Sequence, residues 1–288
     1  MARSGTGREI VVGIDPLDPS VPTLAWAADE GDRRNLSLRL VLAVPPPHDT
    51  RPMGSAPRLT SLRARGREAL ESAGETVFRL SPGLRVVTEL VDGRPAAVLC
   101  RRSAVHARMV VVGSRRLSTP AEILGTRSVA APLSAHADCP VVVVRAPEST
   151  ADLSARLVVG VDGSESSRQA LRFAFEEAGL RRAPVHAVQV WQRPAFTPAG
   201  EESGREECAR LLAAAVAEWS ADRPDVRCTR EIRRGHPVEE LARASAGALG
   251  VVVGRRGRGG YTGMRLGSVT HGLLHRAECP VVTVPGGS

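Results

Sequence analysis

The run Leu157-Val-Val-Gly-Val-Asp162 repeats the earlier run Ile10-Val-Val-Gly-Ile-Asp15 at a distance of 147 residues. Two more pairs of Val-rich runs follow in the same order in both halves of the chain. They are residues 109–113 with 250–254 and residues 139–144 with 279–284. Ordered self-similarity over this distance predicts two copies of one structural unit in tandem.

The length of 288 residues also favours two domains over one large core. We predict a first domain over residues 1–147, a linker over 148–155 and a second domain over 156–288. The linker is placed where Pro, Glu, Ser and Thr separate two apolar runs.

Within each half, short Val-rich runs alternate with longer helical patterns, which is typical of strand-helix-strand units on a parallel sheet. Aromatic residues make up only 3% of the chain, so the core must be built from Val, Leu, Ala and Ile. The predicted fold class is α/β, with two consecutive open five-stranded, mostly parallel sheets and flanking helices. Functional residues of such a fold are expected just after the strands, beyond their carboxyl ends.

The basic residues are all arginine: the chain has 39 Arg, no Lys and a formal net charge of +8. Without Lys, a Walker A phosphate loop and Schiff-base or pyridoxal-phosphate catalysis are excluded. The charge itself leaves two interpretations open, a polyanion partner or an Arg-rich solvated surface. Because Arg is scattered along the whole length, we favour the solvated surface.

Targeting and redox signals are weak. Residues 1–8 are polar, and no apolar run approaches the ~18 residues of a membrane span, so we predict a cytoplasmic protein without membrane contact. The five Cys include no Cys-x-x-Cys pair, which indicates neither a disulfide framework nor a zinc knuckle.

A glycine-rich segment follows the fourth Val-rich run of the second half. It reads Gly254-Arg-Arg-Gly257-Arg-Gly-Gly-Tyr-Thr-Gly-Met-Arg-Leu-Gly267-Ser268-Val269. Glycines let backbone N–H groups approach an anion, and a helix that opens at Gly267-Ser268 would direct its N-terminal amides and dipole at a phosphate. Arg255 and the arginines at 256 and 258 can add positive charge at the rim.

The segment resembles that of the universal stress protein family, whose nucleotide-binding members carry Gly-x2-Gly-x9-Gly-Ser/Thr here. The four positions are matched by Gly254, Gly257, Gly267 and Ser268. The resemblance extends over almost the whole chain as a tandem pair, including Gly-x-Pro before the third helix and the Cys-Pro-Val-Val run. It implies a Rossmann-like fold of the adenine nucleotide alpha hydrolase type, with the two halves packed as a pseudo-dimer.

The resemblance also implies a ligand, ATP or the related ADP or AMP. It places Asp162 near the adenosine moiety, the backbone of Val190 at the adenine, Gly254 and Gly257 along the ribose and phosphates, and Gly267, Ser268 and Val269 on the phosphates. Mg²⁺ or Mn²⁺ would be held by the phosphates, with no metal ligand from the protein. Two alternatives stay open: Asp162 can be a turn residue that caps the next helix, and the glycines can form a surface loop.

The first half departs from this pattern. Asp15, Val44 and Gly113 are retained, but Arg116 stands in place of the second glycine, and Gly125 falls one residue early. Pro120 stiffens the loop, and Pro16 follows Asp15 where the second half has Gly163. We therefore expect the first half to bind nucleotide weakly or not at all.

The terminal runs are candidates for pairing, because apolar edge strands invite partners. In the family the corresponding strands pair between domains, which implies an intramolecular pair of the two halves and further homodimerisation. A covered edge without a partner is the alternative. The residues concerned are Val141, Val142, Val143, Val144, Val281, Val282 and Val284.

Two competing sites are weaker. His271, His275 and Cys279 share a helical spacing, but Cys279 precedes a proline that ends the helix, so a zinc site is not favoured. The Arg-Gly-Gly element over residues 255–260 is the natural RNA-binding competitor, yet it is a single copy between a strand and a helix.

The sequence thus predicts an adenine-nucleotide-binding stress-response regulatory protein with its ligand in the second half. Nucleic-acid binding is the alternative function, and slow ATP hydrolysis is the second alternative. We expect a binding protein rather than an enzyme, because no base beyond Asp162 and no metal cluster is visible in the sequence.

Overall fold

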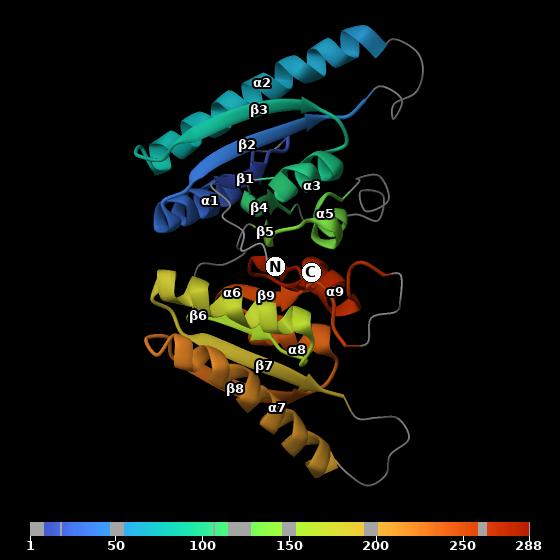
Figure 1. The fold of residues 1–288 in the computed structure, drawn as a ribbon. Helices are drawn as coiled ribbons and strands as arrows, with labels where there is room; N and C mark the ends of the chain where they lie inside the picture. Colours follow the sequence, from blue (N-terminus) through green and yellow to red (C-terminus); the bar gives the residue numbers. More distant parts are fainter. Residues whose placement is uncertain are drawn as a thin grey trace. The chain divides into compact units, whose positions relative to one another are not determined.

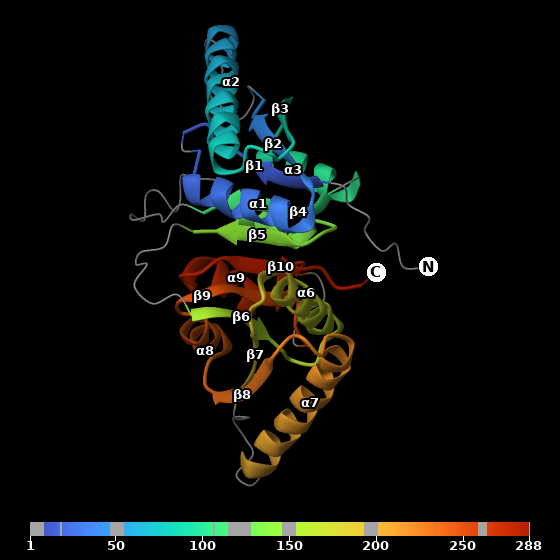
Figure 2. The same cartoon turned by 90° about the vertical axis from the view of Figure 1, so that its left-hand side faces the viewer.

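The computed structural model describes residues 9–17, 19–46, 55–105, 107–114, 128–145, 154–192, 201–258 and 264–287. The chain divides into two compact units between Ala146 and Pro147, called unit 1 and unit 2 below. Each unit is a parallel sheet with helices on both faces (Figures 1 and 2). The predicted α/β class and its tandem arrangement are confirmed.

Unit 1 alternates strands and helices throughout its described length. Its elements are β1 (Glu9–Gly13), α1 (Val21–Arg34), β2 (Ser37–Val44), α2 (Ser55–Leu80), β3 (Val86–Asp92), α3 (Pro95–Val105), β4 (Ala107–Gly113), α5 (Ala130–His136) and β5 (Val141–Val144). The strands lie in the order β3-β2-β1-β4-β5, and each neighbouring pair is parallel.

Unit 2 repeats this organisation. Its elements are β6 (Ser154–Gly160), α6 (Glu165–Arg181), β7 (Val185–Trp191), α7 (Glu201–Asp222), β8 (Cys228–Arg234), α8 (Pro237–Ala244), β9 (Ala248–Gly254), α9 (Ser268–Arg276) and β10 (Val281–Val284). The order β8-β7-β6-β9-β10 is the counterpart of that in unit 1, again with parallel neighbours. β6 begins inside the segment 148–155 that the sequence predicts as a linker, and residues 146–153 lie outside the described residues.

The core of each unit consists of small aliphatic side chains. The central strands are buried on both faces, as in the run Val251–Val253 of β9, which is expected where helices cover both sides of a parallel sheet. α6 packs beside α7 on one face, while α8 packs beside α9 on the other (Figure 2). Among the described residues, no helix is both long and apolar enough to cross a membrane.

The repeat extends to individual side chains. Glu30 and Arg34 form a buried ion pair one turn apart at the end of α1, and Glu177 and Arg181 form the same pair in α6. Each helix then ends at a residue in the left-handed conformation, Asn35 in unit 1 and Arg182 in unit 2. The two units therefore share local geometry as well as topology.

The strand order fixes where a ligand can enter unit 2. β6 lies between β7 and β9, and the chain leaves β6 toward β7 but returns to pair with β6 through β9. Helices that follow these two strands lie on opposite faces, which leaves a crevice beyond their carboxyl ends. The candidate site is built at this point.

Candidate functional site

Two loops meet at the crevice of unit 2. One is the turn between β6 and α6, which carries Asp162; the other is the glycine loop, defined here as residues 254–258, which begins at the last residue of β9. The Oδ2 atom of Asp162 accepts a hydrogen bond of 3.0 Å from the backbone N–H of Arg258. The structure thus brings together residues that are 96 positions apart in the chain.

The glycines of the predicted motif are required sterically. A Cβ atom at Gly254 would lie 2.6 Å from the backbone of Ser166, and one at Gly257 would lie 2.4 Å from Oδ2 of Asp162. Real Cβ atoms do not approach other atoms so closely, so any side chain there would force the loop and the β6–α6 turn apart.

Gly267, at the start of α9, lies against the glycine loop. A Cβ atom there would lie 3.6 Å from the amide nitrogen of Gly257 and 3.4 Å from the Cα atom of Arg256. The N–H of Gly267 donates a 2.9 Å hydrogen bond to the carbonyl oxygen of Arg255, which holds the start of α9 against the glycine loop. Because neither Gly257 nor Gly267 carries a side chain, no Cβ atom of these two residues enters the space between the glycine loop and the start of α9.

The N-terminus of α9 is directed at that space. Gly267 occupies the N-cap position and no side chain of the described residues caps the helix, whereas the Ser164 hydroxyl caps α6 by accepting the N–H of Ser167. The N–H groups of Ser268, Val269 and the next residue have no intrahelical acceptor, because the first such bond runs from His271 to Gly267. These groups and the helix dipole favour an anion.

The predicted adenine position needs a correction in register. Val190 does not follow the strand; it lies within β7, which continues to Trp191. The carbonyl oxygen of Val188 accepts the N–H of Val161 from the β6 side, and alternate residues of a strand face the same side. The N–H and C=O of Val190 therefore point past the end of β6, toward the crevice.

The strand register also identifies the residue of unit 1 that corresponds to Val190. The carbonyl oxygens of Val44 and Trp191 accept the N–H groups of Gly93 and Gly235, so Val44 corresponds to Trp191. Its backbone is directed at β3 and away from the crevice. Ala43 is the unit 1 position equivalent to Val190.

The rest of the unit 1 site is only partly described. Asp15 accepts the N–H of Leu17 at 2.9 Å, as Asp162 accepts that of Ser164 at 3.0 Å. Gly113 ends β4, and a Cβ atom there would lie 2.8 Å from the Thr23 hydroxyl. The loop departures predicted at Arg116, Pro120 and Gly125 lie outside the described residues.

The arginines of the glycine loop have different surroundings. The N–H of Arg255 donates to the carbonyl oxygen of Val284 at 2.7 Å, which continues the contact between β9 and β10. Arg256 and Arg258 are exposed. The guanidinium of Arg258 extends over Gly163, where a Cβ atom would lie 3.4 Å from its Nη1. Arg258 therefore borders the Asp162 side of the crevice.

Three contributors were missed in the sequence. Ser164 is an N-cap residue, and its position before Glu165 is a recognisable helix-start signal. Ser166 accepts the N–H of Arg256 at 3.4 Å, and Thr270 donates to the carbonyl oxygen of Gly254 at 2.8 Å. Neither of these has a local signal, because its partner is far away in the chain.

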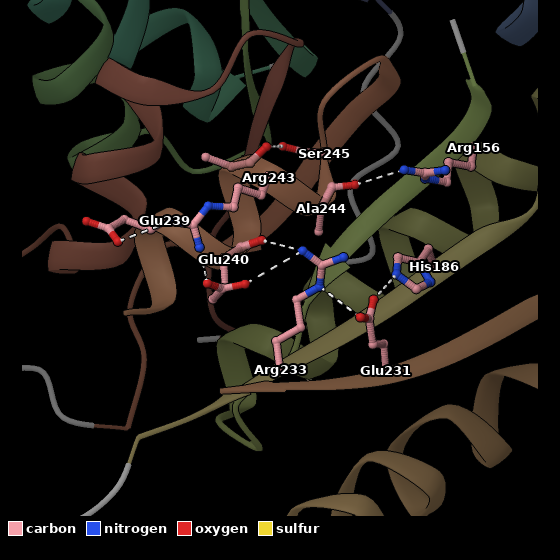
Figure 3. A network of polar contacts seen from close by, with 10 residues as sticks. Arg156, His186, Glu231, Arg233, Glu239, Glu240, Arg243, Ala244 and Ser245 are labelled. Atoms are coloured by element: carbon pink, nitrogen blue, oxygen red, sulfur yellow. Dashed lines mark hydrogen bonds and ion pairs between the residues drawn. The ribbon is translucent and has the colours of Figure 1, made fainter. Parts of the chain in front are cut away.

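Other polar clusters lie apart from this site. His186, Glu231, Arg233 and Glu240 form a network across β7, β8 and α8 (Figure 3). The rings of His271 and His275 stand 4.7 Å apart. Within the described ranges, no group of three or more His, Cys, Asp or Glu residues is placed to hold a metal ion.

Comparison with known proteins decides the family. The profile of the Universal stress protein family matches residues 7–145 and again residues 154–285. The chain belongs to the universal stress protein family. This confirms the resemblance seen in the glycine motif, and the double match confirms the tandem form.

Universal stress proteins of mycobacteria are similar over the full length. One from Mycolicibacterium smegmatis is 35% identical, with 99% of each chain covered. One from Mycobacterium tuberculosis is 33% identical, with 98% of each chain covered. The crystal structure of a universal stress protein from Archaeoglobus fulgidus has the same fold, with a TM-score of 0.74 at 16% identity and coverage of 99% of this chain and 98% of that one.

Proposed function

We propose that unit 2 binds an adenine nucleotide, ATP or the related ADP or AMP, and that the protein acts as a stress-response regulator. The observation that carries the proposal is the pairing of an uncapped helix N-terminus with an open glycine loop. The proposal is supported by the N–H groups at the start of α9, which lies against the glycine loop, and by Gly257 and Gly267, which put no side chain between them. A phosphate group is the ligand that such a space suits.

The adenosine end would lie toward β7. There the N–H and C=O of Val190 offer a donor and an acceptor side by side, which matches the donor and acceptor pattern on the edge of an adenine ring. Asp162 lies between this point and the glycine loop. A nucleotide laid across the crevice would thus place its base at β7 and its phosphates at α9.

A divalent cation would be bound through the nucleotide. Asp162, the carboxylate at the crevice, already accepts three hydrogen bonds, from the N–H and hydroxyl of Ser164 and from the N–H of Arg258. These residues fit Mg²⁺ or Mn²⁺ held by phosphate oxygens, where the ion would offset phosphate charge. Because these hydrogen bonds already occupy both of its oxygens, Asp162 is not placed to activate a water molecule, so we expect any ATP hydrolysis to be slow.

Binding of Mg-ATP by calorimetry tests the proposal. We expect one site per chain and a loss of affinity of about tenfold or more in Gly267→Ala, whose new methyl group would enter the phosphate space. Gly83→Ala is the matched control, because a Cβ atom there meets nothing within 4 Å. Equal affinity of the wild type and Gly267→Ala would overturn the assignment. Polyanion binding that falls steeply with salt and survives in Gly267→Ala would instead support the nucleic-acid alternative.

A further inference from the structure

Both carboxylate oxygens of Asp162 are engaged by the protein. Oδ1 accepts the N–H of Ser164 at 3.0 Å and its hydroxyl at 2.6 Å, while Oδ2 accepts the N–H of Arg258 at 3.0 Å. Hydrogen bonds to a charged carboxylate are about twice as strong as neutral ones. The carboxylate therefore joins the β6–α6 turn to the glycine loop.

Two further contacts hold the same loop. The hydroxyl of Ser166 accepts the N–H of Arg256 at 3.4 Å, and the carbonyl oxygen of Arg255 accepts the N–H of Gly267 at 2.9 Å. The N–H groups of Arg256 and Arg258 thus point toward the β6–α6 turn. The amide nitrogen of Gly257, between them, lies beside Gly267 on the proposed phosphate side.

The direction of the Gly257 amide depends on its neighbours. Asp162 holds the N–H of Arg258, in the peptide group that follows Gly257, and Ser166 holds the N–H of Arg256, one peptide group before the one that carries the Gly257 amide. Rotation of the loop would break one of these contacts. The close approach of Gly257 to Oδ2, where a Cβ atom would lie at 2.4 Å, is what permits the contact to Arg258. Gly257 and Asp162 therefore act together: the absence of a side chain at Gly257 lets the Asp162 carboxylate reach the N–H of Arg258.

The turn after β1 in unit 1 differs in sequence from the turn after β6 in unit 2. Asp15 accepts the N–H of Leu17, but Leu17 has no hydroxyl group to take the place of Ser164. Pro16 stands where Gly163 adopts a positive φ of 79°, a value that proline cannot reach.

We propose that Asp162 is a positioning residue that fastens the glycine loop of unit 2 in its anion-binding form, and that Gly257 is needed because a side chain there would displace this carboxylate. The anion-binding role of the loop rests on the proposed nucleotide function. The structural part of the inference can be tested without any ligand.

Limited trypsin digestion of the ligand-free full chain is the first test, because the loop contains the cleavage sites Arg255, Arg256 and Arg258. We expect Asp162→Ala to speed cleavage at these sites about tenfold, since the loss of a charge-assisted hydrogen bond raises the population of the open loop. The cleavage rate of Asp162→Asn should lie between those of the wild type and Asp162→Ala, because the amide oxygen of Asn can accept hydrogen bonds at only one of the two carboxylate positions. Cleavage after Arg101 in unit 1 serves as the internal control. Unchanged cleavage in the loop of both variants would overturn the inference.

A double-mutant cycle on Mg-ATP affinity is the second test. We expect Gly257→Ala to weaken binding about tenfold in the wild type but no more than about threefold in the Asp162→Ala background, where the clash is gone. Equal losses in both backgrounds would refute the coupling. Wild-type protein that binds no adenine nucleotide would refute the proposed function alone, and the trypsin rates would still decide the role of Asp162.

Discussion

The hydroxyl group of Thr270 donates a hydrogen bond of 2.8 Å to the carbonyl oxygen of Gly254. This contact joins the first turn of α9 to the end of β9, so the two walls of the proposed phosphate site are held by one buried side chain. Thr270 is only 3% exposed, which leaves little room for water to replace the contact. The geometry of the site therefore depends on a residue that does not face the ligand.

Replacement of Thr270 by Val should separate these two walls. Val has the same shape but no donor, and it leaves the carbonyl oxygen of Gly254 without this partner, at a cost of about 1–3 kcal/mol in the free energy of unfolding. We also expect weaker Mg-ATP binding. Urea unfolding and calorimetry measure both effects. Thr270→Ser keeps the hydroxyl and should retain most of the affinity; if it binds as weakly as the Val variant, the hydrogen bond is not the cause.

The helix ends of the two units predict a stabilising substitution. Arg182 ends α6 with a φ of 51°, in the left-handed region, where unit 1 uses Asn35 at a φ of 52°. Gly or Asn adopts this conformation at lower cost than Arg. Arg182→Gly should therefore raise the free energy of unfolding by about 0.5–1 kcal/mol. The reverse change, Asn35→Arg, should lower it, and thermal unfolding of both variants would contradict the argument if the two shifts had the same sign.

A buried amide in unit 2 predicts a second stabilising change. Gln189 is 7% exposed, and among the described residues its Oε1 atom has no hydrogen-bond partner, which costs about 1–3 kcal/mol for a buried polar group. The equivalent position in unit 1 is the buried Leu42. Gln189→Leu should raise the melting temperature, measured by calorimetry, while Leu42→Gln should lower it. A lower melting temperature in Gln189→Leu would show that the amide is satisfied in solution.

The network of Figure 3 predicts a pH dependence. Burial by itself would raise the pKa of Glu231, but hydrogen bonds from Arg233 and His186 outweigh it and lower the pKa below its usual value of 4.5. A carboxylate with a lowered pKa contributes stability above its unfolded pKa, and this contribution is lost as the pH falls through the folded pKa. The difference in stability between the wild type and Glu231→Gln should therefore be constant at neutral pH and shrink below about pH 4.5.

Urea unfolding between pH 3 and pH 7 would follow this difference, which should be small because the Glu231 side chain is 39% exposed to screening solvent. The variant Glu68→Gln, at an exposed position of α2, controls for the loss of a surface charge. A difference that grows toward acid pH would contradict the assignment.

Cys228 is predicted to react slowly. Burial raises the pKa of its thiol to about 11, so only about one molecule in a thousand is thiolate at pH 8. Iodoacetamide labelling of the folded protein, followed by mass spectrometry, should modify Cys228 far more slowly than labelling of the urea-unfolded chain. Equal rates would contradict the raised pKa of this half-buried thiol.

The sequence by itself determined the repeat, the α/β class and the spacing of the glycines. These features are local: Val-rich runs and helical patterns follow from the periodicity of apolar residues, and Gly254, Gly257 and Gly267 form one short segment. The resemblance to the universal stress protein family rested on this segment and on the order of the runs around it, and the family profile confirmed it.

The end of a strand was less predictable. The apolar run that ends near Val190 carries no signal for its last paired residue, and the same holds for Val44. Hydrogen bonds from Gly93 and Gly235 on the neighbouring strands fix the register. This register makes Ala43, not Val44, the equivalent of Val190. The difference matters because a shift of one residue turns the backbone N–H and C=O groups to the opposite edge of the strand.

Only the tertiary structure decided how the site is held. Asp162 and Arg258 are 96 residues apart, and Ser166 and Arg256 are 90 apart, so no local pattern links them. Parallel strands bring their carboxyl ends to one edge of the sheet, and the pairing of β6 with β9 places the turn after β6 beside the loop after β9. The sequence identified residues of the β6–α6 turn and of the glycine loop, and the order of the strands determined which of them are in contact.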